Sequence, residues 1–262
     1  MLEKFDLDSI PLIQLLLLTF AVFLFSMWVG IVYGRRYAKG KKEPEKGFGV
    51  IIGGQLTLVA FMIAFVFGIA SSRFDMKRSN LLEEVNSIGT TYLRTDLLAD
   101  PVRSELKNLL KQYVDLRLDA YFHPETLQEV LKKSDEILDK LWKLSSAYAV
   151  SQPSFMTVAL YIQSLNETID LHTKRVTVSI VQKIPIAIWL AAYLLAIICM
   201  FVIGFESGIA NAKLSVPGFL FALTFALVIT LISDLDRSAE GMFKVNQQPM
   251  IELQSKINSE VR

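Results

Sequence analysis

Cysteine and histidine are scarce in this 262-residue sequence, which contains one cysteine and two histidines. Because Cys199 is alone, no disulfide can form within the chain. His123 and His172 belong to no His-x3-His pair, Cys/His cluster or H-E-x-x-H motif, and zinc sites are built from such groupings. We therefore predict no metal site and no cofactor.

Patterns for phosphate and nucleic-acid binding are also lacking. The glycines of "GVIIGG", residues 49–54, are not followed by the Lys and Ser/Thr of a phosphate-binding loop. The formal net charge is only +1, and no basic cluster is interleaved with aromatic residues, as binding of a single strand would require. We predict that the protein has no catalytic residues, is not an enzyme and binds no nucleic acid.

Apolar sequence is abundant. Hydrophobic residues make up 52% of the chain, and the mean hydropathy is +0.41. Charge-free runs occupy residues 10–34, 48–70, 184–205 and 214–233. A helix needs roughly 20 apolar residues to cross the hydrocarbon core of a membrane. The sequence therefore predicts four transmembrane helices in a lipid bilayer.

The loop between the first two runs is basic. Residues 35–47, "RRYAKGKKEPEKG", hold six Lys or Arg residues against Glu43 and Glu45, and short basic loops stay in the cytoplasm. This orientation places the middle of the chain and residues 238–262 outside the cytoplasm, in the periplasm if the membrane is a bacterial inner membrane. The basic residues after the second run carry less weight, since they flank a long segment.

The middle segment, residues 71–183, has the pattern of a helical bundle. Leu81, Val85, Ile88 and Tyr92 recur at spacings of four, three and four, which places them on one helix face. Prolines at 101, 124 and 153 divide the segment into four helices. The predicted fold is an all-α integral membrane protein in which transmembrane helices 1 and 2 (residues 1–70) and 3 and 4 (184–237) flank an antiparallel four-helix bundle, followed by a tail at 238–262.

The links between membrane and bundle lack strong helix breakers. The second membrane helix is expected to continue into the bundle, and the last bundle helix is expected to run into the third membrane helix with Pro185 as the only kink. On that last helix Asn166, Asp170, Thr173 and Thr177 form a polar stripe beside His172. A solvated face, a seam between subunits or a ligand site would each produce such a stripe.

The second run carries two patterns at helical spacing. Gly49 and Gly53 form a G-x-x-x-G pair, which lets helices pack closely within the chain or between copies. Thr57, Phe61 and Phe65 follow at i, i+4 and i+8 on one face. Around a symmetric oligomer this face would line a hydrophobic constriction, whereas in a single chain it would be an ordinary packing or lipid-facing surface.

Charges follow two of the apolar runs. The fourth run ends in Asp234, Asp236 and Arg237, and Arg73 follows the second run. In the predicted orientation both groups lie at the same membrane surface. They would either pair across the bundle as interface charges or form the vestibule of a pore.

Three stretches carry a family resemblance: "FGVIIGGQLTLVAFMIAFVFGIASSRFDMKRSNLLEEVNSIGTTYLRTDLL", "SLNETIDLHTKR" and "LISDLDRSAEGMFKVNQQP". They resemble the bestrophin-like family of bacterial membrane proteins, which is distantly similar to the bestrophin channels. Bestrophins are pentamers, and the resemblance implies a pore lined by the second membrane helix, with Thr57, Phe61 and Phe65 at its neck. The dense acidic run of calcium-responsive bestrophins is replaced here by spaced acids.

Two functions are compatible with these observations. The first is a homo-oligomeric ion channel whose second transmembrane helix lines the pore. The second is a non-conducting scaffold or sensor whose helical bundle binds a partner outside the cytoplasm. The sequence does not specify the ion or the sign of its charge.

Overall fold

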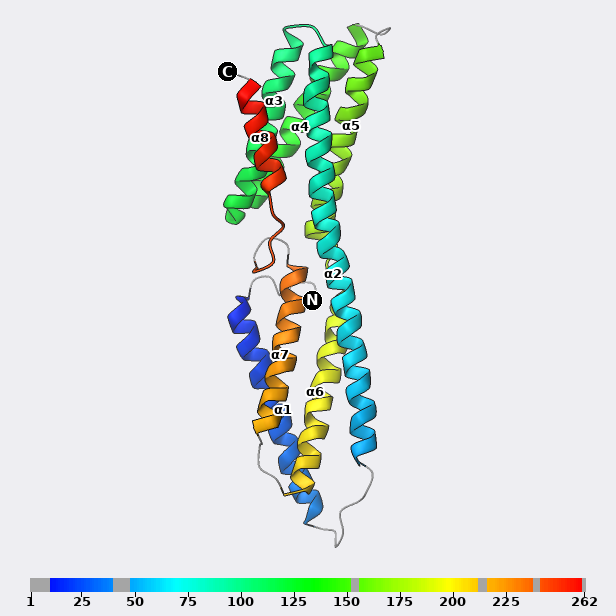
Figure 1. Ribbon diagram of the computed structural model, residues 1–262, viewed down its shortest axis with the longest axis vertical. Coiled ribbons are helices and arrows are strands. Elements are labelled where there is room, and N and C mark those ends of the chain that lie inside the picture. Colours follow the sequence, from blue (N-terminus) through cyan, green and yellow to red (C-terminus); the bar gives the residue numbers. More distant parts are fainter. Residues whose placement is uncertain (1–9, 40–47, 152–155, 212–215, 238–240, 261–262) are drawn as a thin grey trace. The chain divides into compact units, whose positions relative to one another are not determined.

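The computed structural model describes residues 10–39, 48–151, 156–211, 216–237 and 241–260, and every regular element in these ranges is a helix (Figure 1). The all-helical fold class is as predicted. The α-helices are α1 (Leu12–Ala38), α2 (Phe48–Arg94), α3 (Val102–Phe122), α4 (Leu127–Ser151), α5 (Met156–Val176), α6 (Ile186–Ile209), α7 (Val216–Asp236) and α8 (Gln248–Glu260). Short turns of 3-10 helix at Thr95–Leu97 (η2) and Pro124–Thr126 (η3), and of π-helix at Thr177–Val181 (η4), complete the order.

Four of these helices are long and apolar enough to cross a membrane, namely α1, α2, α6 and α7. They coincide with the four charge-free runs, so the prediction of four apolar helices is confirmed. Most of the basic loop at 35–47 lies outside the described residues, as does the Gln152-Pro153 pair.

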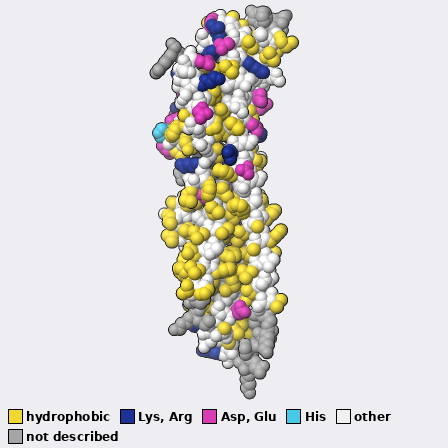
Figure 2. Space-filling model, viewed as in Figure 1, with side chains coloured by type: hydrophobic (Ala, Val, Ile, Leu, Met, Phe, Trp, Pro, Cys, Tyr) yellow, Lys and Arg dark blue, Asp and Glu magenta, His cyan; other side chains and the backbone are white. Residues whose placement is uncertain are grey.

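The chain divides into two compact units. The first comprises residues 1–73 and 183–243, and the second comprises residues 74–182 and 244–262. Helix α2 is unbroken from Phe48 to Arg94 and contributes residues to both, as the absence of a breaker predicts. Figure 2 shows hydrophobic side chains gathered over the surface of the first unit and most Lys, Arg, Asp and Glu side chains over the second.

The expected continuous helix into the third apolar run is wrong. Helix α5 ends at Val176, the π-helical turn η4 follows, and α6 begins only at Ile186 after Pro185. Proline has no N–H to donate and disfavours helix at the preceding residue. The interruption leaves the N–H of Ile184 without a helical partner, and it donates instead to the Asp236 carboxylate.

Glycines bring α1 and α6 into backbone contact in the first unit. A Cβ placed on Gly30 would lie 2.1 Å from the carbonyl oxygen of Phe201, and one on Gly204 would lie 2.1 Å from that of Met27. Gly34 and Gly208 extend the seam by one turn. Only a hydrogen fits at these positions, and the close approach supplies the van der Waals contact that holds apolar helices together in lipid.

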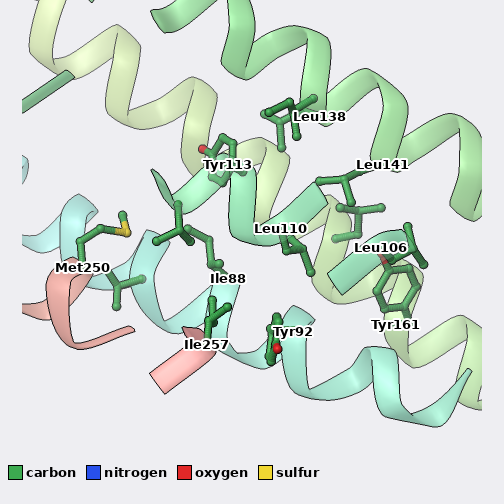
Figure 3. Packing of buried hydrophobic residues seen from close by; sticks show 14 of the residues in the cluster. Ile88, Tyr92, Leu106, Leu110, Tyr113, Leu138, Leu141, Tyr161, Met250 and Ile257 are labelled. Atoms are coloured by element: carbon green, nitrogen blue, oxygen red, sulfur yellow. The ribbon is translucent and has the colours of Figure 1, made fainter. Parts of the chain in front are cut away.

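The hydrophobic core of the second unit is shared by α2, α3, α4, α5 and α8 (Figure 3). Leu81, Val85, Ile88 and Tyr92 are all buried, so the predicted apolar face of this part of α2 is confirmed. Met250 and Ile257 of α8 pack against it.

The expectation of a plain tail at 238–262 missed α8. The structure places residues 244–262 in the second unit, where α8 packs beside α3. Met250 and Ile257 lie two turns apart on the buried face of this helix. With only two fully buried apolar residues, the segment carries a weak helical pattern in the sequence, and burial against α2 and α3 stabilises it.

Candidate functional site

The face of α2 that bears Thr57, Phe61 and Phe65 is exposed in the single chain. Phe61 is 68% exposed and Phe65 is 50% exposed, whereas Val59 and Val66 on another face of the helix are buried. The hydroxyl of Thr57 donates to the carbonyl of Gly53 at 2.9 Å, so its proton is satisfied within the helix. The face therefore presents two phenyl rings and a threonine to whatever lies beside the chain.

The Gly49 and Gly53 pair has open space around it. Among the described residues, no atom lies within 4 Å of a Cβ built on either glycine. The close helix packing in this unit is made instead by the glycines of α1 and α6. Contact of Gly49 and Gly53 with a second copy stays a prediction.

The charges at the end of α7 are engaged within the first unit. Arg73 of α2 pairs with Asp236 at 3.2 Å between Nη1 and Oδ1, and both side chains are nearly buried. The other carboxylate oxygen of Asp236 accepts the N–H of Ile184 at 3.3 Å. Asp236 thus ties α2, α7 and the start of α6 together, which is the interface role that the sequence allows. A charge pair this buried needs such additional bonds to offset its lost hydration.

Asp234 holds the chain segment that follows α7. Its carboxylate accepts the N–H of Met242 at 3.0 Å and that of Phe243 at 3.3 Å. Gly241 permits this turn, because its φ is +157° and a Cβ there would lie 2.0 Å from Asp234 Oδ1. Arg237 donates to the carbonyl of Ile10. The acids and the arginine after the apolar run therefore fasten local structure, and their vestibule role stays a prediction.

A second cluster of charges lies inside the second unit and centres on Glu84, whose side chain is fully buried. The guanidinium of Arg175 donates to Glu84 Oε2, and Arg117 Nε lies 3.2 Å from Oε1. The hydroxyl of Tyr113 donates to Oε1 at 2.7 Å. Arg175 also donates to Gln247, which lies just before α8.

These contacts decide the charge state of Glu84, which lies well beyond the apolar run at 48–70. Burial raises the pKa of the carboxyl, but the charges of Arg175 and Arg117 and the hydrogen bond from Tyr113 outweigh it and lower the pKa to about 2. Burial and the neighbouring Glu84 carboxylate both raise the pKa of Tyr113. Glu84 is therefore an ionised carboxylate and Tyr113 a neutral hydroxyl donor at neutral pH.

His172 of α5 joins the same cluster. Its Nδ1 lies 2.8 Å from the Tyr113 oxygen, and its Nε2 lies 3.1 Å from Asp135 Oδ1 on α4. Burial lowers the pKa of His172, and the positive charge of Arg117 lowers it further. Asn166, Asp170 and Thr173 of the predicted stripe are exposed, which fits a solvated face, whereas His172 points into the core.

Sequence reasoning did not identify Glu84, Tyr113 or Arg117. A usable signal exists in two polar stripes at helical spacing. Asn80, Glu84, Ser87 and Thr91 recur along α2, and Ser164, Thr168, His172 and Arg175 recur along α5. Thr168 shares hydrogen bonds with Ser87 at 2.9 Å and Thr91 at 3.0 Å. Each stripe lies directly beside an apolar stripe, so both faces enter the core.

A metal centre has no support among the described residues, where no group of three His, Cys, Asp or Glu side chains could hold an ion. Cys199 is buried in α6 with a free thiol.

Comparison with solved structures identifies the fold. Two crystal structures of variants of a bacterial bestrophin homologue from Klebsiella pneumoniae match with TM-scores of 0.65 each. Their sequence identities are 13% and 14%, and each match covers 95% of this chain and 97% of the other. A crystal structure described only as a membrane protein variant matches with a TM-score of 0.60 at 14% identity, covering 95% of this chain and 97% of that one.

Comparison with sequences agrees. No curated protein matches the chain, but the family model of the Bestrophin-like domain matches residues 17–250. This range includes most of α1, the whole of α2, α6 and α7, and the second unit up to the start of α8. The chain therefore belongs to the Bestrophin-like domain family.

Proposed function

We propose that the protein is a homo-oligomeric ion channel whose pore is lined by α2. The main support for the proposal is the exposed face of α2, on which Thr57, Phe61 and Phe65 lie on one side of the charge-free part of the helix. Family membership and a fold like that of bestrophin homologues support it, since the resemblance to bestrophins assigns the pore to this helix. We propose no enzymatic activity and no cofactor.

The chemistry of the face suits a hydrophobic constriction. Copies of α2 arranged about a symmetry axis would bring Phe61 and Phe65 into two stacked rings of phenyl groups. A narrow apolar ring gates by excluding water, and an ion passes only when the ring widens enough to admit its hydration shell. Gly49 and Gly53, which are open on this chain, would let neighbouring copies of α2 approach near one end of the pore. By analogy with bestrophins, the oligomer is a pentamer.

We infer further that residues 71–183 form a four-helix bundle outside the cytoplasm, on a bacterial inner membrane. The basic loop at 35–47 supports this orientation. The test is cysteine labelling of intact cells. Val150 of α4 is 82% exposed, so Val150→Cys in a Cys199→Ser background offers one accessible thiol. Labelling by a membrane-impermeant maleimide supports the orientation, and labelling only after cell lysis reverses it.

Ion flux through the purified protein tests the channel. In planar bilayers, chloride and then sodium would be replaced by large impermeant ions. Discrete currents whose reversal potential follows one replacement are expected, and they would also assign the sign of the permeant ion.

Silent bilayers with intact oligomer would favour the alternative function, a scaffold or sensor. The observation that favours this alternative is the second unit, which has a hydrophobic core of its own and need not serve conduction. A partner that co-purifies in a fixed ratio, without ion flux, would establish it.

A further inference from the structure

The contacts around His172 require more hydrogens than its neutral form supplies. Three contacts stand in a row: Glu84 Oε1 to the Tyr113 oxygen at 2.7 Å, that oxygen to His172 Nδ1 at 2.8 Å, and His172 Nε2 to Asp135 Oδ1 at 3.1 Å. Each contact needs one hydrogen between its two atoms. The hydroxyl of Tyr113 supplies one, a neutral imidazole supplies one, and a carboxylate supplies none.

Neither neutral tautomer satisfies the row. With the hydrogen on Nδ1, Tyr113 donates to Glu84 and accepts from His172, but the Nε2 lone pair then faces the Asp135 carboxylate. With the hydrogen on Nε2, Asp135 is satisfied, but Nδ1 then takes the Tyr113 hydrogen and leaves Glu84 Oε1 facing an oxygen lone pair. An imidazolium has both hydrogens and completes all three bonds.

We propose that His172 is a proton-binding site inside the second unit, and that its proton joins α5 to α4 through Asp135. A proton needs no cavity, so the close packing around His172 is no obstacle to this ligand. The uptake adds an N–H donor to Nε2 and breaks no other hydrogen bond. Because the Asp135 side chain is 71% exposed, water can supply its hydrogen bonds when His172 is neutral.

Every helix packed around His172 contributes a charged or titratable group. Glu84 comes from α2, Tyr113 and Arg117 from α3, Asp135 from α4, and Arg175 from α5 itself. The segment before α8 contributes the uncharged Gln247, which bonds Arg175. The carboxylates favour the imidazolium, whereas burial and Arg117 oppose it.

The opposing effects set the direction of the pH response. The pKa of His172 is lowered from its ordinary value of 6.5, first by burial and then by Arg117. The site therefore takes up its proton in acid, below that value. Because the unfolded chain binds the proton more readily, the stability that His172 contributes is present above pH 6.5 and is lost as the pH falls through the lowered pKa. Asp135 limits this loss, because its negative charge favours the protonated form of His172 in the folded state.

The test is a proton titration of the full-length protein in detergent by NMR, with 13C at the ε1 position of histidine. His123 is the other histidine in the chain, so in the His123→Gln variant the only histidine signal comes from His172. His123 is exposed, and its replacement leaves the cluster intact. We expect one transition at a pH below 6.5, and in Asp135→Asn we expect proton affinity at least about threefold weaker, because an opposing charge nearby favours the protonated ring.

Asp139→Asn is the matched control, because Asp139 is an exposed acid one turn further along α4. It should leave the transition unchanged. A His172 signal that does not titrate between about pH 4 and 8 would overturn the proposal, since that range brackets the ordinary value for histidine. Equal proton affinities in Asp135→Asn and the parent protein would also overturn it. The proposal depends only on residues of the second unit, so its test is independent of whether the protein conducts ions.

Discussion

The two halves of α2 differ in which side chains they bury, although the helix is unbroken. Along 48–70 the large side chains Phe61 and Phe65 are exposed, and the buried positions are all apolar, namely Ile52, Val59, Val66 and Ala70. Along 74–94 the buried positions include Asn80, Glu84, Ser87 and Thr91, interleaved with the apolar core residues. In the first half apolar groups point outward, and in the second half polar groups point inward.

The difference is explained by the surroundings of each half. Lipid and the apolar face of a neighbouring copy are both as apolar as a phenylalanine side chain, so the first half gains little by burying Phe61 and Phe65 within its own chain. In the second half, removing apolar groups from water stabilises the fold, and each buried polar group needs a hydrogen-bond or charge partner. The ionised Glu84 finds three, and Ser87 and Thr91 share Thr168.

The largest effect is expected from removing the central charge of the second half. Glu84→Ala leaves the buried guanidinium groups of Arg117 and Arg175 without the Glu84 carboxylate. Removing one partner of a buried ion pair lowers the free energy of unfolding by about 3–5 kcal/mol. Glu83→Ala is the matched control, because Glu83 pairs with Lys174 at the surface and exposed pairs contribute at most about 1 kcal/mol. Unfolding of both variants, followed by circular dichroism, gives the comparison. Equal losses would show that the buried cluster contributes no more to stability than the surface pair does.

Acid should weaken the same cluster. The pKa of Glu84 is lowered from 4.5 to about 2 by Arg175, Arg117 and Tyr113, which outweigh burial. Its contribution to stability is therefore present above pH 4.5 and is lost as the pH falls towards about 2. We expect the free energy of unfolding to drop over this window, and to drop less steeply in Glu84→Gln, which has no carboxyl to protonate. Parallel pH profiles would contradict the assignment.

A smaller effect separates two kinds of glycine in the apolar helices. Gly204→Ala forces a methyl group against the backbone of α1, and overpacking of this kind costs about 1–3 kcal/mol. Gly53→Ala meets open space, so in the isolated chain it should be neutral or slightly stabilising. If Gly53 contacts a second copy, the variant should lose oligomer without losing helix. Crosslinking and thermal unfolding of both variants measure this, and an unfolded Gly53→Ala chain would contradict it.

The sequence predicts the helices more readily than their contacts. Runs of apolar residues identify the membrane-capable helices, because crossing lipid requires length and apolarity alone. The spacing of Leu81, Val85, Ile88 and Tyr92 identifies a core face, because apolar residues three or four positions apart lie on the same side of a helix. The sequence predicts a kink at Pro185 but not the π-helical turn at Thr177–Val181 that ends the helix before it. The helix at 248–260 was missed because its stability depends on burial against helices distant in sequence.

The candidate sites show the same limit. Gly49 and Gly53 match the packing pattern as well as Gly30 and Gly34 do, but only the latter meet facing glycines at 204 and 208. His172 is one residue in a polar stripe until the fold brings Tyr113 and Asp135 to its two nitrogens. Pairings between helices distant in sequence decide both cases, and a single sequence does not specify them.

The central claim is that Phe61 and Phe65 narrow a pore lined by α2, and single-channel conductance tests it most directly. We predict that the Phe61→Ala and Phe65→Ala variants conduct more than the parent protein in planar bilayers, because each removes a ring of phenyl groups. Phe67→Ala, which alters an exposed phenylalanine on another face of the helix, should conduct as the parent does. Unchanged conductance in both constriction variants, with oligomer intact, would contradict the claim.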